Sequence, residues 1–343
     1  MSISPNGSAH SPNDTFWWRR NAFSSMLTKE LSSLDSQESI AELIRFGIYI
    51  RPAKLFRYRR CGKHSFEDLE NGTVCFSSAR TFSKADPLDC SLGLPDKPSD
   101  IEMIAVQKSM CQFETLSNMS NKKVGDVFGN VQAILPQVKD MTFGECIGTG
   151  SDLKANLSNT GTIIGKLLNQ CNDGIERLFK TTKILCTTGR DDNAYMWSNF
   201  ADSERGFVLE YSTQDLLSIG NEINMAPTSM PIIYRDKESD FGMLPALFLI
   251  LNTQVEDDAI KSYTMLTFIK LIFTKGVSFS DEEEWRVFSY VLEGEREDDH
   301  ILRPCKARAV ILGRNMSPEN RERAITAARR NGIKVREQPD ELK

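Results

Sequence analysis

Short apolar segments rich in aromatic and β-branched residues recur along the chain, and residues that favour turns separate them. This pattern predicts β-strands. Two strands are expected early, at 54–59 and 73–78, with the turn signal Asn71-Gly72 just before the second. Beyond residue 180, further strands are predicted at 184–188, 206–211, 231–234, 285–291, 307–313 and 333–335.

Helices are predicted where apolar residues recur at intervals of three or four. In the last helix, Ser317 is a good N-cap, Pro318 suits the first helical position, and Asn331-Gly332 ends the helix. A strand–helix–strand unit at this end implies one parallel strand pair. The helices are expected at 39–46, 65–70, 193–200, 243–253, 257–274 and 318–330.

These elements predict an α+β fold with a mixed, partly antiparallel sheet, flanking helices, a C-terminal β-α-β unit and a helical insertion. Residues 1–22 are predicted to form a disordered or partner-binding tail, in which Trp17 and Trp18 are the expected partner contact. Residues 23–99 and 181–343 are expected to form the two parts of the α+β core, and 100–180 the helical insertion.

Charge and residue usage exclude several classes of protein. The net charge of −5 argues against a surface that coats nucleic acid. No run of about 18 apolar residues is present, so we expect no membrane partner. None of the eight cysteines lies in a CxxC pair and the three histidines are far apart, so no metal site is predicted. We expect a protein that is cytoplasmic or secreted from a bacterium into a host cell.

The acidic cluster Asp281-Glu282-Glu283-Glu284 runs directly into the strand predicted at 285–291. Strand side chains alternate, so Glu282 and Glu284 are expected to project from one side and Glu283 from the other. Two carboxylates placed in this way can tune each other's proton affinity. The structural alternatives are an acidic loop that caps the strand and a local ion pair between Glu284 and Arg286.

Six short motifs occur in a fixed order along about 50–100 and 183–338: Phe56-Arg57-Tyr58-Arg59, Val74-Cys75-Phe76-Ser77-Ser78, Asp86-Pro87-Leu88-Asp89, Met196-Trp197-Ser198-Asn199-Phe200-Ala201 followed by Gly206, Glu282-Glu283-Glu284-Trp285-Arg286, and Ile311-Leu312-Gly313. Together they resemble the signature of the bacterial domain of unknown function 2971 family. The family name implies no activity, so function must be argued from a site.

The arrangement also resembles, more distantly, ADP-ribosyltransferases of the arginine–serine–glutamate type. These carry an Arg on an early strand, a Ser on a second strand and a Glu-x-Glu that enters a late strand. The resemblance implies NAD as substrate, Glu284 and Glu282 as catalytic residues, and a cofactor-binding set of Arg57, Arg59, Tyr58, Ser77, Ser78, Asp86 and Trp197.

In the implied reaction, the nicotinamide–ribose bond of NAD breaks and ADP-ribose is transferred to an unknown protein or nucleic-acid acceptor. A guanidinium can grip the pyrophosphate, and Trp197 or Phe82 is expected to stack on a ring. Glu284 is expected to stabilise the oxocarbenium-like ribose, and Glu282 to orient or deprotonate the acceptor. A bacterial toxin, a defence protein or a secreted effector would use such chemistry.

Two alternatives come from other classes of function. The chain can be a non-catalytic partner-binding module or effector that uses its aromatic residues and its acidic loop. It can also be a metal-dependent phosphodiesterase with a hard cation held by Asp86, Asp89, Glu282 and Glu284.

Overall fold

The computed structural model describes residues 21–23, 25–26, 36–84, 86, 89–90, 123, 142, 179–219, 228–235, 271–290 and 298–342. The predicted tail up to residue 20, the helix predicted at 243–253, most of the one predicted at 257–274 and nearly all of the predicted insertion lie outside these residues. Trp17 and Trp18 lie outside them as well.

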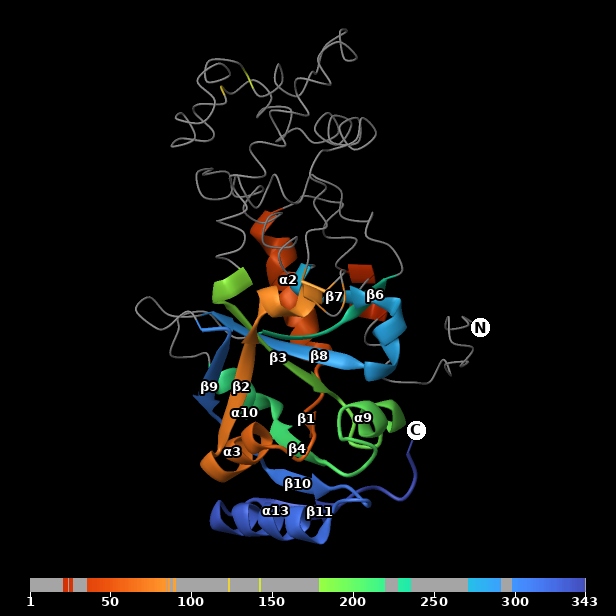
Figure 1. Cartoon of the computed structure of the whole chain (residues 1–343). Helices are drawn as coiled ribbons and strands as arrows, with labels where there is room; N and C mark the ends of the chain where they lie inside the picture. Colours follow the sequence, from red (N-terminus) through yellow and green to blue (C-terminus); the bar gives the residue numbers. More distant parts are fainter. Residues whose placement is uncertain are drawn as a thin grey trace.

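A mixed sheet of nine strands forms the centre of the described part of the chain (Figure 1). Seven strands follow the order β11-β10-β4-β1-β3-β2-β9, and β8 pairs with both β3 and β5. Their bounds are β1 Lys54–Arg59, β2 Thr73–Ser78, β3 Thr182–Thr188, β4 Phe207–Ser212, β5 Thr228–Pro231, β8 Glu284–Tyr290, β9 His300–Pro304, β10 Ala309–Leu312 and β11 Lys334–Glu337.

Strand β3 holds the sheet together because it pairs with three neighbours. It pairs with β8 along its whole length, from Thr182 opposite Tyr290 to Thr188 opposite Glu284. Its other edge is shared: the start of β3 pairs with β2, and Thr188 pairs with Phe56 of β1. The sheet therefore forks between β1 and β2.

A second, two-stranded parallel sheet lies next to the first. It consists of β6 (Ile233–Arg235) and β7 (Thr274–Gly276). The 3₁₀ helix η5 (Val277–Glu282) connects β7 to β8, so the small sheet and the large sheet meet at the start of β8.

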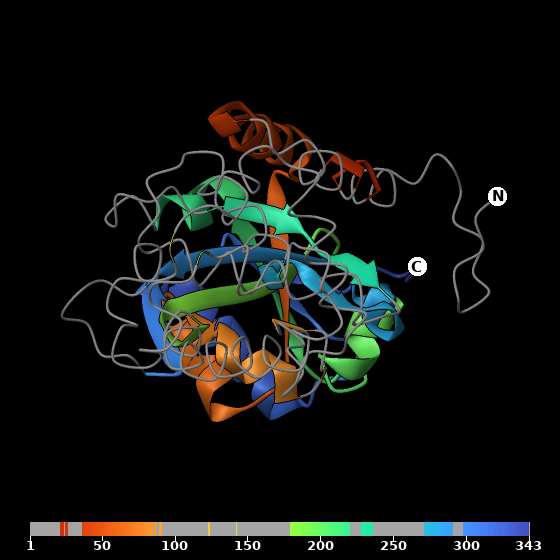
Figure 2. The ribbon, with the colours of Figure 1, turned by 90° about the horizontal axis from the view of Figure 1, so that it is seen from above.

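The helices lie on the outside of the strands (Figure 1, Figure 2). Helix α13 packs against α3, β10 and β11, and α2 packs against β5. Helix α9 contributes Met196 and Trp197 to a buried cluster with Phe56 and Tyr58. The helix bounds are α2 Ser36–Ile50, α3 Lys63–Asn71, α9 Ala194–Asn199, α10 Thr213–Ser218 and α13 Pro318–Arg330, and the 3₁₀ helix η1 covers Ala79–Lys84.

The structure confirms the predicted α+β class and the C-terminal β-α-β unit. Strands β10 and β11 pair in parallel, and the Ser317 side chain accepts a hydrogen bond from the Asn320 amide at the start of α13. Two predictions were wrong in detail. The segment predicted as one strand at 231–234 belongs to both β5 and β6, and the helix predicted to end at 274 ends earlier because Thr274 begins β7. The helices in the described part of the chain are all too short or too polar to span a membrane.

The motif that ends in Gly206 has a backbone explanation. After α9, Asp202, Ser203 and Glu204 all adopt φ values between 53° and 66°, in the left-handed region that residues other than glycine seldom occupy. Gly206 then passes so close to β1 that a Cβ atom would overlap the carbonyl oxygen of Arg59. This tight approach requires glycine and fixes α9 beside the sheet.

Candidate functional site

The three glutamates of the acidic cluster point in two directions because the backbone turns at Glu283. Glu282 is the last residue of η5, Glu283 has a φ of 48°, and Glu284 is the first residue of β8. Glu282 and Glu284 both contact Lys275, whereas Glu283 pairs with Arg190 at 3.4 Å. The predicted grouping of Glu282 with Glu284 is confirmed, but a left-handed residue produces it and not strand alternation.

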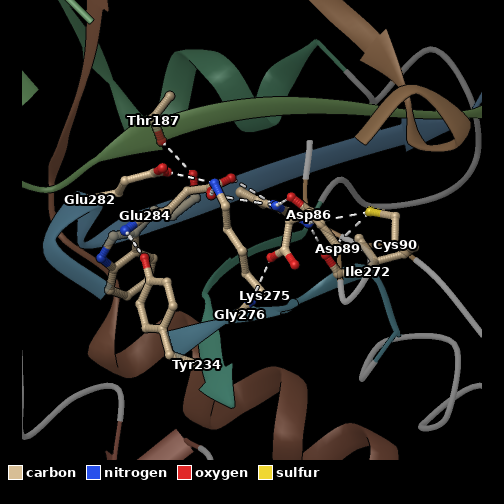
Figure 3. A network of polar contacts seen from close by, with 12 residues as sticks. Asp86, Asp89, Cys90, Thr187, Tyr234, Ile272, Lys275, Gly276, Glu282 and Glu284 are labelled. Carbon is tan, nitrogen blue, oxygen red and sulfur yellow. Dashed lines mark hydrogen bonds and ion pairs between the residues drawn. The ribbon is translucent and has the colours of Figure 1, made fainter. Parts of the chain in front are cut away.

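Lys275 of β7 joins the two carboxylates (Figure 3). Its Nζ donates to Oε2 of Glu282 at 2.7 Å and to Oε2 of Glu284 at 3.2 Å. The Lys275 side chain is 12% exposed, compared with 6% for Glu282 and 3% for Glu284, so it is the most accessible of the three groups. The site thus contains a nearly buried ammonium ion between two carboxylates.

Arg286 continues the network on the inner side of Glu284. Its fully buried guanidinium donates from Nε to Oε1 of Glu284 at 2.7 Å. It also contacts both carboxylate oxygens of Asp89 at 2.8 Å and donates to the carbonyl oxygen of Ile272. Five charged groups therefore alternate in sign, in the order Asp89, Arg286, Glu284, Lys275 and Glu282. We call them the charge chain.

The pKa values of the two glutamates in the charge chain are shifted in opposite directions. Burial and the negative charge of Glu284 raise the pKa of Glu282 to about 7. Burial also disfavours ionised Glu284, but the positive charges of Arg286 and Lys275 outweigh burial and lower its pKa to about 2. At neutral pH, these shifts leave Glu284 ionised and Glu282 partly protonated. Burial lowers the pKa of Lys275, but its two carboxylate partners outweigh that effect and raise it.

Neighbouring polar groups fix the backbone around the charge chain (Figure 3). The carboxylate of Asp86 accepts a hydrogen bond from the Gly276 amide at 2.6 Å, next to Lys275. The amide of Glu284 donates to the Tyr234 hydroxyl at 2.9 Å, and the Thr187 hydroxyl donates to the carbonyl of Trp285. Each of these contacts joins segments that are far apart in the sequence, so the geometry of the charge chain depends on how the whole protein folds.

Cysteine chemistry is not favoured here. Cys90 and Cys186 both lie beside the charge chain, and burial raises the pKa of each thiol well above its usual value. Because the thiolate is the reactive form, these two cysteines are poor nucleophiles.

The structure does not bring Arg57 and Arg59 together with Glu284. Directly paired strand residues share a sheet face, so Phe56, Thr188 and Glu284 lie on one face and Arg57 on the other. Arg57 donates to the carbonyl of Cys75 at 2.8 Å across the fork between β1 and β2. Arg59 forms an ion pair with the buried Asp68 of α3.

The other predicted cofactor-binding residues are dispersed. The Ser77 hydroxyl lies 3.2 Å from Nδ1 of His300 on the outer strands, and Ser78 is buried and donates to the carbonyls of Phe179 and Lys180. Of the predicted set, Asp86 lies close to the charge chain. It precedes Asp89 by three positions and accepts a hydrogen bond from the amide of Gly276, the residue after Lys275.

Of the aromatic residues predicted to contact the cofactor, Trp197 and Tyr58 have core positions and Phe82 is half-buried. Trp197 is fully buried, meets Tyr58 edge-on with ring centres 5.3 Å apart, and donates to the carbonyl of Asp191. It therefore offers no open face for stacking, which corrects the expected role. Tyr58 donates to the carbonyl of Arg190, and the Phe82 ring lies 5.1 Å from the Arg286 guanidinium carbon.

The four acidic residues of the phosphodiesterase alternative do not form a metal site. Among the described residues, no group of three or more His, Cys, Asp or Glu side chains is placed to hold a metal ion. Physically, Lys275 and Arg286 already occupy the positions between these carboxylates, and a divalent cation would be repelled by them.

Sequence reasoning missed two members of the charge chain and underestimated a third. Lys275 lies in the sequence Thr274-Lys275-Gly276, which carries no motif. The sequence analysis predicts Asp89 as part of a family motif and as a metal ligand, and not as a partner of Arg286. Arg286 was expected to form a local ion pair with Glu284. That pair exists, but the burial of Arg286 and its contact with Asp89, 197 positions away in sequence, required the structure.

Residues 196–287 match the model of a family described as Protein of unknown function (DUF2971). This match supports the resemblance to the bacterial domain of unknown function 2971 family. The matched segment contains Lys275, Glu282, Glu284 and Arg286, so four of the five groups of the charge chain belong to it. No curated protein and no solved structure matches the chain.

Proposed function

We propose that the charge chain is the acid–base centre of an enzyme that cleaves the nicotinamide–ribose bond of NAD and transfers ADP-ribose to an acceptor. The observation that carries the proposal is the pair of glutamates on one lysine, with the pKa of Glu282 raised to about 7 and that of Glu284 lowered to about 2. A difference in pKa of this kind allows two neighbouring carboxylates to take different roles in catalysis.

The reaction needs both roles. The C–N bond between ribose and nicotinamide breaks, and nicotinamide leaves with the bonding electrons. Positive charge develops on the ribose, and a carboxylate that stays ionised stabilises it. The acceptor then forms a bond to the same ribose carbon and loses its proton to a base whose pKa lies near neutrality. Glu284 fits the first role and Glu282 the second.

The position of Lys275 supports a site that stabilises positive charge. Its ammonium group lies between the two carboxylates, at 2.7 and 3.2 Å, in a nearly buried position. In low-dielectric surroundings, a cation at that place is held far more strongly than at the surface. A ribose that develops positive charge would be stabilised by the same two carboxylates only in the place of the Lys275 ammonium, because a second cation beside Lys275 would be repelled by it.

The proposal assigns no residue to the NAD pyrophosphate. Arg57 and Arg59 lie across the sheet from Glu284, and both contact other groups there.

Nicotinamide release from NAD by the purified protein tests the proposal, with and without cell lysate as a source of acceptor. Glu284→Gln and Glu282→Gln should each lower release by roughly 100-fold or more, the usual size of an acid–base or electrostatic contribution. Glu210→Gln is the matched control, because Glu210 is also buried and paired, with Lys54 and Arg336, but lies outside the site.

Release that survives in Glu210→Gln and is lost in both site variants would support the proposal. Release that is equal in all four proteins would exclude the assigned glutamates. A folded wild-type protein that releases no nicotinamide, with or without lysate, would contradict NAD chemistry. In that case, the partner-binding module becomes the better hypothesis.

A further inference from the structure

Arg286 joins Glu284 to Asp89, whereas Lys275 joins Glu284 to Glu282. Arg286 is fully buried. It donates to Oε1 of Glu284 at 2.7 Å and to Oε2 at 3.4 Å, and it contacts both carboxylate oxygens of Asp89 at 2.8 Å. A guanidinium held in this way has a fixed orientation, because its planar fork matches two carboxylates at once. Arg286 therefore fixes the orientation of the Glu284 carboxylate, including the oxygen that contacts Lys275.

We propose that Asp89 and Arg286 are positioning residues for the glutamate pair, which keep Glu284 ionised and aimed at Lys275 so that the exchangeable proton resides on Glu282. The inference rests on the proposed function, since it concerns the same two glutamates. It gives a role to two residues of the charge chain, of which Asp89 lies in a segment outside the family match.

The physical reason lies in the order of charges. Among the described residues, Glu284 contacts two cations, Lys275 and Arg286, whereas Glu282 contacts one, Lys275. A proton that enters the site is therefore bound more weakly at Glu284, where it would be repelled by both cations. Asp89 completes the arrangement, because it compensates the charge of Arg286 and prevents the guanidinium from turning away.

Other ionisable groups also face the two glutamates. Tyr195 and Asp281 lie near Glu282, and Cys186 forms a hydrogen bond with Glu284. The remaining neighbours are Tyr234 on the amide of Glu284, Cys90 on Arg286, and Asp86 on the amide of Gly276. Among these side chains, none carries a positive charge, so Lys275 and Arg286 are the cations that decide where the proton resides.

The test is a direct titration of the two glutamates by carbon NMR of side-chain carboxyl groups in the full-length protein. Glu282→Gln and Glu284→Gln assign the signals. In the wild type, Glu284 should titrate far below Glu282. In Arg286→Met, the midpoint of Glu284 should rise by at least one pH unit, the usual effect of losing an adjacent opposite charge.

Two conservative variants separate positioning from structural support. Arg286→Lys keeps the charge but loses the fork, so the midpoint of Glu284 should shift less than in Arg286→Met. Asp89→Asn should lower the midpoint of Glu282, because the charge chain loses a negative charge. Asp68→Asn is the matched control, since Asp68 is also a buried partner of an arginine but lies with α3.

The inference is overturned if Asp89→Asn shifts the Glu282 midpoint no more than Asp68→Asn does. It is also overturned if folded Arg286→Met leaves Glu284 titrating as in the wild type. If Arg286→Met does not fold, Asp89→Asn and Arg286→Lys decide the question. The titration needs no NAD, so its failure is distinguishable from a failure of the proposed function.

Discussion

Two groups of buried charges in this protein lie on different faces of its sheet and differ in composition. In the first group, the guanidinium groups of Arg57 and Arg59 on β1 lie near the carboxylate of Asp68 on α3. At the start of β8, the charge chain has two cations and three carboxylates. One group has a surplus of positive charge and the other a surplus of carboxylate.

The difference decides which group can carry acid–base chemistry. A surplus guanidinium keeps its proton at every physiological pH, so it can bind but cannot exchange a proton. A surplus carboxylate in a buried site moves its pKa toward neutrality, as Glu282 does. The lesson is that the kind of charge left unmatched, more than the number of ion pairs, points to the candidate site.

The largest change in stability is expected when Arg286 is removed from the charge chain. Arg286→Met should lower the free energy of unfolding by about 3–5 kcal/mol, because it leaves Asp89 and Glu284 buried without their guanidinium partner. Urea denaturation at pH 7 measures this loss. A loss below about 1 kcal/mol would show that the charge chain is far more solvated than its burial indicates.

The surplus carboxylate should also appear in the dependence of stability on pH. The pKa of Glu282 is raised in the folded protein, so its contribution is complete below about pH 4.5 and is lost as pH rises through about 7. That contribution amounts to at most about 3 kcal/mol. Urea midpoints measured between pH 5 and 8 should therefore fall in the wild type and fall less in Glu282→Gln.

Glu284 works in the opposite direction. Its pKa is lowered on folding, so its contribution is present above about pH 4.5 and is lost as pH falls toward 2. The two windows do not overlap, so the titrations of Glu282 and Glu284 can be separated. A wild-type protein whose stability between pH 5 and 8 matches that of Glu282→Gln would contradict the raised pKa.

Removing the Asp68 carboxylate on α3 should have a smaller effect. Asp68→Asn should cost about 1–3 kcal/mol, since it weakens the bond to Arg59, whose side chain is still 21% exposed and partly solvated. The slope of stability between pH 5 and 8 should equal that of the wild type. A changed slope would mean that the two charge groups are coupled through the sheet.

The smallest effect is expected at Arg57. Arg57→Met removes the hydrogen bond to the Cys75 carbonyl, but it also removes a half-buried charge whose pKa is lowered by burial and by the nearby Arg59. The two effects oppose each other, so the change in unfolding free energy should stay within about 1 kcal/mol. A much larger loss, measured by urea denaturation, would indicate that the fork between β1 and β2 depends on this residue.

The sequence predicted the elements well where the pattern was local. Strands β2 and β10 and helix α13 follow from alternation, capping residues and the stop signal Asn331-Gly332. Strand β9 was missed because it is a short edge strand, His300–Pro304, whose exposed and partly exposed residues lack the apolar character of the central strands. Strand β7 has three residues and was masked by a longer helical pattern.

The candidate site was predicted in part for the same reason. The order of motifs and the sequence of β8 were enough to indicate that Glu282 and Glu284 lie together and that Arg286 pairs with Glu284. Local order could not show that Lys275 and Asp89 complete the charge chain, because their contacts with β8 arise only when distant segments fold together. Nor could it show that Arg57 and Arg59 face away from Glu284, since that follows from strand register.

By itself, then, the sequence determined which segments are strands and helices, because backbone preference and apolar periodicity act over a few residues. The tertiary structure decided which charges meet, how deeply they are buried and which carboxylate is left to exchange a proton. Those properties depend on Coulomb energies and desolvation, which are set by distances in space and not by separation along the chain.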